Sequence, residues 1–320
     1  MKKVLLTEKI NSEGLKLLEG KADVVIARDI TEQALMNEVG DAFGIVLKSA
    51  SRITRRIIEH APDLKVISRT GAGYDNVDVA AASEHGILVC NLPGINSTPV
   101  AEYTIALILG LLKRISELDR YTRGGEWAKR HEYISRDAEG KTLGIIGFGR
   151  IGQKVAQKAK YGLGMDILVY DPYVQSQFED KVNFCDDLKD LFLKSDIISL
   201  HVPNLPETKC MVTRELLWKM KREAYIINTS RGDIIDECAL IDALRERRIA
   251  GAGLDVFEHE PIAQDHPFLR MDNVILSPHS AALTRECGVK MTLEAVGQVI
   301  DYLEGRIPPF IVNAKELGIR

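Results

Sequence analysis

Residues 143–152 read LGIIGFGRIG, and this stretch decides the fold class of the chain. Gly147, Gly149 and Gly152 have the G-x-G-x-x-G spacing of a dinucleotide-binding turn. The apolar residues before them predict a strand, the residues after them predict a helix, and a second strand-like run ends at Asp171. This order of strand, glycine turn, helix, strand and carboxylate indicates a nucleotide-binding βαβ unit.

Each residue of this unit has a separate predicted role. Gly147 permits the tight turn, Gly149 lets the backbone approach a pyrophosphate, and Gly152 lets the helix pack closely on the strand. The carboxylate of Asp171 can accept hydrogen bonds from the ribose hydroxyls of NAD and repels the additional phosphate of NADP. Residues 172–177 include no Lys or Arg that would attract that phosphate. The sequence therefore predicts NAD as the cofactor.

Short apolar runs alternate with helical patterns on both sides of this unit. The first series predicts strands at 4–6, 24–26, 44–47, 64–67 and 87–90, with helices such as 31–39 and 55–60 between them. The second series predicts strands at 143–146, 167–170, 197–200, 225–228, 253–257 and 274–276, and helices at 153–161, 188–193, 214–220 and 237–247. Such alternation is typical of parallel sheets covered by helices. We therefore predict an α/β chain with two doubly wound parallel sheets.

The two series are separated by a loop rich in Pro, Gly, Asn and Ser at 91–99. Near the end of the chain an apolar stripe has helical spacing and consists of Val289, Leu293, Val296, Ile300 and Leu303. No strand follows that this helix could connect, so we expect it to pack back on the first sheet. The first domain would then be discontinuous, with residues 1–97 and 288–320, and residues 98–287 would form an inserted domain.

Composition and charge fit a globular protein with two domains. The 320 residues exceed one ordinary core, and 45% of them are hydrophobic and 28% charged. A formal net charge of −4 gives no reason to expect a nucleic-acid or membrane partner. The five cysteines are scattered without a C-x-x-C pair, so we expect no disulfide framework, no metal site and a cytoplasmic location. We also expect no signal peptide, and the longest apolar stretch, 103–112, is too short to span a bilayer.

Reactive side chains follow three predicted strands of the second series. Arg231, Glu260 and His279 each come after a different strand, and ligands of parallel sheets bind at the carboxyl ends of the strands. An arginine can hold a substrate carboxylate, a histidine can transfer a proton, and a glutamate can stabilise the protonated imidazole. This is the set that oxidation of a 2-hydroxy acid needs. Position alone leaves Glu258 as a rival of Glu260 and His201 as a rival of His279, and it also allows all of them to be structural.

Seven motifs connect these residues along nearly the whole chain. They are GAGYDNVD at 71–78, NSTPVAE at 96–102, GKTLGIIGFGRIG at 140–152, HVP at 201–203, NTSRGDIID at 228–236, GAGLDVFEHEP at 251–261 and SPH at 277–279. With these motifs the chain resembles the D-isomer-specific 2-hydroxyacid dehydrogenases, and within them the phosphoglycerate dehydrogenase-like branch. The chain ends soon after the tail helix, so the resemblance is to a short form without the regulatory extension of longer phosphoglycerate dehydrogenases.

The resemblance implies a catalytic set of Arg231, Glu260 and His279, with Glu258 and His201 in supporting positions. It implies a flavodoxin-like substrate domain made from both chain ends, with an NAD-binding Rossmann domain inserted in it, and a homodimer. The implied cofactor-binding residues are Gly147, Gly149, Arg150, Ile151, Gly152, Asp171, His201, Val202, Pro203, Thr208, Thr229, Ser230, Asp255 and Thr104. The implied substrate-binding residues are Lys48, Ser49, Ala72, Gly73, Arg231 and His279, and the amides around Ala72 and Gly73 would meet the substrate carboxylate.

The expected activity is NAD-dependent hydride transfer between nicotinamide and a D-2-hydroxy acid or its 2-oxo acid, with 3-phosphoglycerate and phosphohydroxypyruvate as a candidate pair. Phosphate binding would need further cations, and the candidates are Lys48, Arg52, Lys129 and Arg130. A glyoxylate, hydroxypyruvate or other 2-oxo acid reductase is the alternative substrate class. An NAD-sensing interaction protein, like the similar corepressors, is an alternative of another class. Formate dehydrogenase-like relatives pair the histidine with glutamine, so Glu260 argues against that activity.

Overall fold

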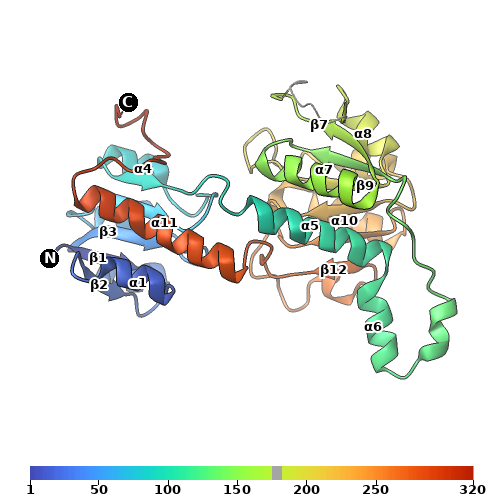
Figure 1. Cartoon of the computed structure of the whole chain (residues 1–320), viewed down its shortest axis with the longest axis horizontal. Helices are drawn as coiled ribbons and strands as arrows, with labels where there is room; N and C mark the ends of the chain where they lie inside the picture. Colours follow the sequence, from blue (N-terminus) through green and yellow to red (C-terminus); the bar gives the residue numbers. More distant parts are fainter. Residues whose placement is uncertain (175–181, 320) are drawn as a thin grey trace. The chain divides into compact units, whose positions relative to one another are not determined.

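The computed structural model describes residues 1–174 and 182–319, and the chain divides into two compact units. Unit 1 comprises Met1–Asn96 with Leu283–Arg320, and unit 2 comprises Ser97–Ala282 (Figure 1). Residues 283–287 therefore group with unit 1, although the sequence placed them in the inserted domain. The reason is that the final helix already begins at Arg285, and the buried Cys287 contributes to the core of unit 1.

Unit 1 is built on a parallel sheet with the strand order β2-β1-β3-β4-β5. The strands are β1 (Lys3–Leu6), β2 (Asp23–Ile26), β3 (Ala42–Leu47), β4 (Val66–Arg69) and β5 (Leu88–Cys90). The predicted strand at 64–67 is wrong by two residues at each end. Leu64 belongs to a turn in which its amide donates to the Ala61 carbonyl at 3.1 Å, and pairing with β3 begins only at Val66.

Helices cover both faces of this sheet because successive strand residues point to opposite sides. The helices are α1 (Ser12–Leu18), α2 (Glu32–Glu38), α3 (Arg55–Glu59), α4 (Val79–Glu84) and α11 (Arg285–Leu303). Leu5 packs on the face of α2, α3 and α4, whereas Val4 and Leu6 pack on the face of α1 and α11. Helix α11 packs on this second face and completes the core of unit 1 (Figure 1). Of the predicted stripe, Val296, Ile300 and Leu303 contribute to this core, whereas Val289 and Leu293 are partly exposed and lie outside it. The face that packs on the sheet also includes Met291, Ala295 and Val299.

Unit 2 has a larger parallel sheet with the order β12-β11-β10-β9-β6-β7-β8 among the described residues. Its strands are β6 (Thr142–Ile146), β7 (Asp166–Tyr170), β8 (Asn183–Phe184), β9 (Ile197–Leu200), β10 (Tyr225–Asn228), β11 (Gly251–Leu254) and β12 (Val274–Leu276). The strand order reverses between β6 and β9, which is where ligands bind in such folds. The glycine turn directly follows β6 and therefore lies at this switch point.

Two features of this sheet differ from the sequence prediction. The strand predicted at 253–257 is β11 (Gly251–Leu254), because pairing with β12 ends at Leu254 and Asp255 starts a turn. β8 (Asn183–Phe184) was not predicted, because a two-residue edge strand has no apolar run of its own.

The helices of unit 2 pack on the sheet in two layers with separate cores. Helices α5 (Ser97–Leu112) and α7 (Arg150–Leu163) cover one face, and α8 (Leu188–Lys194), α9 (Arg214–Lys219) and α10 (Glu237–Arg245) cover the other. Short 3-10 turns occur at η1 (Trp127–His131), η2 (Gly232–Ile234) and η3 (Pro267–Arg270). Helix α6 (Ile115–Arg123) was not predicted as an element, and it buries none of its residues. Within unit 2, α6 and η1 form a projecting segment (Figure 1). No helix in residues 1–174 and 182–319 is long and apolar enough to cross a membrane.

Candidate active site

Arg231 lies in a turn that follows β10 and is fixed by short-range contacts. The side-chain amide of Asn228 donates to the Arg231 carbonyl at 2.8 Å, and its Oδ1 accepts the Ser230 amide at 3.0 Å. Gly232 packs so closely on Phe257 that a Cβ there would overlap its backbone carbonyl. Sequence reasoning missed Asn228 as the anchor of this turn, because Asn at the end of a strand is common in turns of every kind.

Glu260 and His279 form a direct pair at the same edge of the sheet. The Nδ1 atom of His279 lies 2.7 Å from Oε2 of Glu260, and Oε1 of Glu260 accepts the Phe257 amide at 3.1 Å. The side chains of His279 and Glu260 are 42% and 36% exposed, so a small molecule can reach the imidazole. The rival Glu258 is exposed, and its backbone amide donates to Glu237 at 3.2 Å.

The charge of Glu260 depends on both other members of the predicted set. Burial raises the pKa of Glu260, but the hydrogen bond and charge of His279, the Phe257 amide and the positive charge of Arg231 lower it. The net effect is a pKa below the usual carboxyl value. The carboxylate is therefore ionised near neutral pH, with one oxygen 2.7 Å from Nδ1 of His279.

The turn that carries His279 is held by the buried carboxylate of Asp255. Oδ1 of Asp255 accepts the Ser277 hydroxyl at 2.6 Å and the Ser280 amide at 2.8 Å, and Oδ2 accepts the Ala281 amide at 2.9 Å. The amide of His279 donates to the Asp255 carbonyl at 2.8 Å, and His279 has a left-handed backbone with φ of 51°. The Asp255 side chain thus positions the His279 turn, a role that the sequence did not indicate.

The glycine turn after β6 has the geometry that a dinucleotide requires. Gly147 has φ of 88°, and a Cβ there would meet the His201 carbonyl. A Cβ on Gly152 would overlap the Gly147 carbonyl oxygen, whereas Gly149 faces open space. Gly149 caps α7 without a side-chain hydrogen bond, so the helix N-terminus that begins with Arg150 and Ile151 is open to an anion. The residues present therefore fit a pyrophosphate.

Asp171 follows β7 and faces this turn. Its Oδ2 accepts the Phe148 amide at 2.7 Å, and its Oδ1 accepts the Tyr173 amide at 2.9 Å. The carboxylate is thus fixed beside the loop that would hold the pyrophosphate, as a ribose-binding residue must be. Residues 175–177, which contributed to the prediction against NADP, lie outside the described part of the chain.

His201 is a poor candidate for the acid or base. The residue as a whole is partly exposed, but its imidazole ring is buried, and Nε2 of the ring lies 2.8 Å from the Ser199 hydroxyl. Burial lowers the pKa of His201 to about 3, so the ring is neutral near pH 7. The following residues Val202 and Pro203 continue the loop after β9, and the Pro203 carbonyl accepts the Thr208 hydroxyl at 2.6 Å.

Three predicted cofactor residues use their hydroxyls within the protein. Thr104 of α5 contacts Thr229 through their hydroxyl oxygens at 3.0 Å, and Thr104 also donates to the Val100 carbonyl at 2.8 Å. The Ser230 hydroxyl donates to the Leu200 carbonyl at 3.0 Å. These bonds fasten the turn after β10 to its neighbours and leave its backbone groups as the contacts available to a ligand.

The predicted substrate residues of unit 1 follow β3 and β4. Lys48 directly follows β3, and its Nζ lies 3.6 Å from Oε2 of Glu8, while Ser49 is exposed. Ala72 and Gly73 follow β4, and their amides donate no hydrogen bond to any described residue. These two donors are therefore available to an acceptor such as a carboxylate.

Arg69 is a cation near these amides that the sequence prediction missed. It is the last residue of β4, and its Nη1 donates to the Thr70 carbonyl at 3.1 Å. Gly71, with φ of 154°, lies directly over this guanidinium, since a Cβ there would overlap Nη1. An arginine at a strand end carries no signal of its own, and the contact depends on the path of the following turn.

The other candidate cations for a phosphate have different surroundings. Arg52 is exposed, Lys129 is paired with Glu126, and the guanidinium of Arg130 lies 5.7 Å from the ring centre of Trp127. Among the described residues, no group of three His, Cys, Asp or Glu side chains is arranged to hold a metal ion.

Comparison with known proteins gives matches over the whole chain. The family model for the D-isomer specific 2-hydroxyacid dehydrogenase, NAD binding domain, matches residues 105–281. A D-3-phosphoglycerate dehydrogenase of Methanocaldococcus jannaschii is 41% identical over 315 residues, which are 98% of this chain and 60% of the relative. The chain thus spans less than two thirds of that relative. A glyoxylate reductase of Korarchaeum cryptofilum is 38% identical over 325 residues, covering 99% of this chain and 98% of the relative.

A solved structure extends the similarity to the fold. The NADPH-dependent glyoxylate/hydroxypyruvate reductase of Sinorhizobium meliloti superposes with a TM-score of 0.89 at 27% sequence identity, and the match covers 100% of both chains. The arrangement of an inserted NAD(P)-binding domain in a discontinuous domain is therefore the one found in these proteins.

Proposed function

Because the chain belongs to the D-isomer specific 2-hydroxyacid dehydrogenase family, we propose that it uses NADH to reduce a short 2-oxo acid of the glyoxylate and hydroxypyruvate class. The observation that carries the proposal is the 2.7 Å pair of His279 and Glu260, together with the charge of Arg231 that acts on Glu260. The substrate class is supported by the glyoxylate reductase that matches this chain over nearly its full length.

Each residue of the set has one role in this proposal. Arg231 binds the substrate carboxylate and polarises the oxo group, because its planar fork of donors fits a carboxylate. His279 donates a proton to the oxo oxygen, and Glu260 stabilises the imidazolium that makes this donation possible. NADH, when bound, supplies the hydride. The amides of Ala72 and Gly73, which no described residue uses, are proposed as further donors to the substrate carboxylate.

NAD rather than NADP is the proposed cofactor because of Asp171. Its carboxylate is fixed by the Phe148 and Tyr173 amides at the place where the adenosine ribose would lie, and its charge would repel a ribose phosphate. The similar reductase of Sinorhizobium meliloti is NADPH-dependent, so the family accommodates both cofactors and the preference has to be measured.

Oxidation of 3-phosphoglycerate is the second candidate, favoured by one feature of unit 1. The guanidinium of Arg69 lies beside the turn that leads to Ala72 and Gly73. A substrate with a phosphate as well as a carboxylate would need such a further cation. Lys48, which directly follows β3, is partly neutralised by Glu8. The identity to the longer D-3-phosphoglycerate dehydrogenase also supports this candidate.

A homodimer is the proposed oligomeric state. The proposed interface includes Trp127 and Ile115 on the projecting segment of α6 and η1, which are 67% and 56% exposed and offer apolar area to a second copy. Light scattering should therefore report about twice the mass of one 35.6 kDa chain. A Trp127→Asp variant that remains as dimeric as the wild type would exclude this surface as the interface.

The activity is tested by NADH oxidation with glyoxylate, hydroxypyruvate and phosphohydroxypyruvate, followed by chiral analysis of the hydroxy acids. His279→Ala should lower kcat by roughly 10²- to 10⁴-fold, the usual contribution of a positioned acid. His259→Ala is the matched control, since His259 is exposed on a neighbouring loop. A preference of at least tenfold for phosphohydroxypyruvate over hydroxypyruvate would select the second candidate. If no 2-oxo acid is turned over, the proposed reductase activity is refuted, and an NAD-binding interaction protein is the interpretation that remains.

A further inference from the structure

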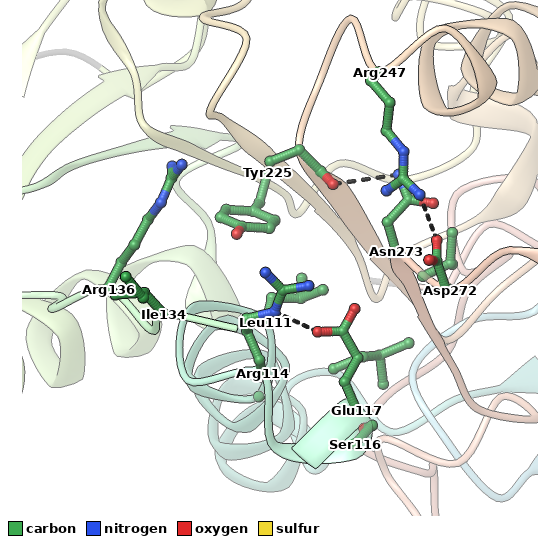
Figure 2. A pocket seen from close by; sticks show the side chains of 14 residues that line it. Leu111, Arg114, Ser116, Glu117, Ile134, Arg136, Tyr225, Arg247, Asp272 and Asn273 are labelled. Carbon is green, nitrogen blue, oxygen red and sulfur yellow. Dashed lines mark hydrogen bonds and ion pairs between the residues drawn. The ribbon is translucent and has the colours of Figure 1, made fainter. Parts of the chain in front are cut away.

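A cavity of about 200 Å³ lies in unit 2 at the edge of the sheet where β10, β11 and β12 begin (Figure 2). Tyr225 and Val274, the first residues of β10 and β12, contribute to its lining. Arg231 and His279 follow the opposite ends of the same strands. The cavity is therefore separate from the proposed active site and from the glycine turn.

The phenol of Tyr225 forms the polar centre of this cavity. Its hydroxyl makes no hydrogen bond to any described residue, although the side chain is partly buried. Burial raises the pKa of Tyr225, and the charges of Arg136 and Arg114 act in the opposite direction. The hydroxyl is thus a protonated donor near neutral pH. Figure 2 shows the phenol facing the guanidinium of Arg114.

Two arginines of the lining have a left-handed backbone conformation, which is strained for every residue except glycine. Arg114, at the junction of α5 and α6, has φ of 53°, and Arg247, after α10, has φ of 51°. A left-handed conformation costs a non-glycine residue on the order of 1–2 kcal/mol. Arg247 pairs with Asp272 at 2.6 Å. Arg114 bonds Glu117 through Nε and lies over the Tyr133 ring with Cζ 4.4 Å from the ring centre, and its Nη1 and Nη2 make no hydrogen bond to the described residues.

Charge and shape limit what the cavity can hold. Each of its three arginines has a carboxylate partner: Arg114 pairs with Glu117, Arg247 with Asp272, and Arg136 with Glu223 at 3.2 Å. Leu111, Val274 and the 80% exposed Ile134 add an apolar wall. The volume is below the range of roughly 300–1,000 Å³ that is typical of drug-sized ligands. The occupant must therefore be small and partly apolar, with an acceptor for the Tyr225 hydroxyl and the terminal nitrogens of Arg114.

We propose that this cavity binds a small organic acid. The carboxylate accepts hydrogen bonds from the Tyr225 hydroxyl and from the terminal nitrogens of Arg114, and the hydrocarbon part lies against Leu111, Ile134 and Val274. Charge-assisted bonds from a guanidinium are the strong contacts of such a site, and the phenol adds direction. The site does not depend on the proposed reductase activity.

Isothermal titration of the full chain with benzoate tests this site, and benzamide serves as a neutral probe of the same shape. The variants are Tyr225→Phe and Arg114→Met, and the matched control is Arg222→Met, an exposed arginine three residues before Tyr225. Tyr225→Phe removes a single oxygen and keeps the ring, so it decides the question if Arg114→Met disturbs the junction of α5 and α6. Turnover of the best 2-oxo acid is measured in parallel.

Benzoate should bind with a Kd of roughly millimolar order, as expected for a ligand of this size. Tyr225→Phe and Arg114→Met should each weaken it by roughly 10- to 100-fold, the value of one hydrogen bond to a charged group. Arg222→Met should bind as the wild type does, and Tyr225→Phe should keep the wild-type turnover. The proposal is overturned if the wild type does not bind benzoate, if benzamide binds equally well, or if Tyr225→Phe binds benzoate with an unchanged Kd.

Discussion

Replacing Glu260 by Gln should move the pH profile of the proposed reduction to lower pH. In this direction His279 must carry a proton, and the Glu260 carboxylate 2.7 Å away stabilises that proton. Glutamine keeps an oxygen that can accept the Phe257 amide, so the substitution removes the charge and leaves the size of the side chain. The protonated imidazole then becomes less stable, and the rate falls at a lower pH than in the wild type.

The size of the shift follows from the exposure of the pair. Hydrogen bonds to charged groups contribute about 1.5–3 kcal/mol when they are sheltered, whereas exposed ion pairs contribute about 0.2–1 kcal/mol. With side chains 42% and 36% exposed, this pair lies between the two cases. A value of about 1–1.5 kcal/mol corresponds to a displacement of roughly one pH unit, since one unit equals about 1.36 kcal/mol.

The assay is kcat/KM for reduction of the best 2-oxo acid between pH 5 and 10, with oxidation of the product acid measured in the same buffers. The reverse reaction needs the neutral imidazole, so its rising limb should also move to lower pH in Glu260→Gln. Because the pKa of Glu260 is lowered, the wild-type pair should stay charged below the usual carboxyl range. Glu258→Gln is the matched control. Profiles of Glu260→Gln that coincide with the wild type in both directions would refute the assigned role.

Three further predictions concern the cofactor, the histidine turn and the glycine turn. Asp171→Asn removes the charge and keeps the shape, so the ratio of kcat/KM with NADH to that with NADPH should fall by roughly 10- to 100-fold; an unchanged ratio would show that Asp171 does not select the cofactor. Asp255→Asn puts a side-chain NH₂ group beside the Ser277 hydroxyl and the Ser280 amide, which donate hydrogen bonds to the carboxylate in the wild type. The turn should shift and displace the imidazole of His279, so kcat should drop by roughly 10²-fold. Exposed Asp265→Asn is its control, and equal kcat values in the two variants would contradict the positioning role. Gly152→Ala should lower the unfolding free energy by about 2 kcal/mol, since its Cβ would overlap the Gly147 carbonyl oxygen, whereas Gly162→Ala in the same helix meets open space and should not destabilise. Denaturant unfolding of the two variants measures the difference.

The sequence was sufficient for most strands because each is a short apolar run, whether it is fully buried like β9 or partly buried like β12. β9, β10 and β12 have the predicted bounds. The errors occur where burial and strand pairing do not coincide. Leu64 is buried by a turn, and Phe257 is buried beyond the end of β11, so apolar character alone extended both strands wrongly. Helix α6 has no buried residue and therefore no core-facing stripe to detect.

The sequence predicted at which edge of the sheet the candidate site lies, but it did not predict the contacts that hold the site together. The rule that ligands bind at carboxyl strand ends brought Arg231 and His279 to one edge. Position alone left Glu258 as a rival of Glu260, and only the family resemblance separated them. The path of the loop that brings Glu260 to His279 is set by contacts with Gly232 and Glu237. No pattern in the sequence states these contacts. The burial that neutralises His201 is likewise a property of the folded chain.

The tail helix α11 has a consequence for the order in which the chain can fold during synthesis. The face of the first sheet formed by Val4, Val46 and Val66 is covered in part by Val296 and Val299 of α11. These helix residues leave the ribosome about 200 positions after the last strand of the sheet. Unit 2 can therefore reach its native state first. Until α11 has been synthesised, the N-terminal part of unit 1 has an uncovered apolar surface that chaperones and proteases can bind. A premature stop anywhere before Arg285 would leave that surface permanently open.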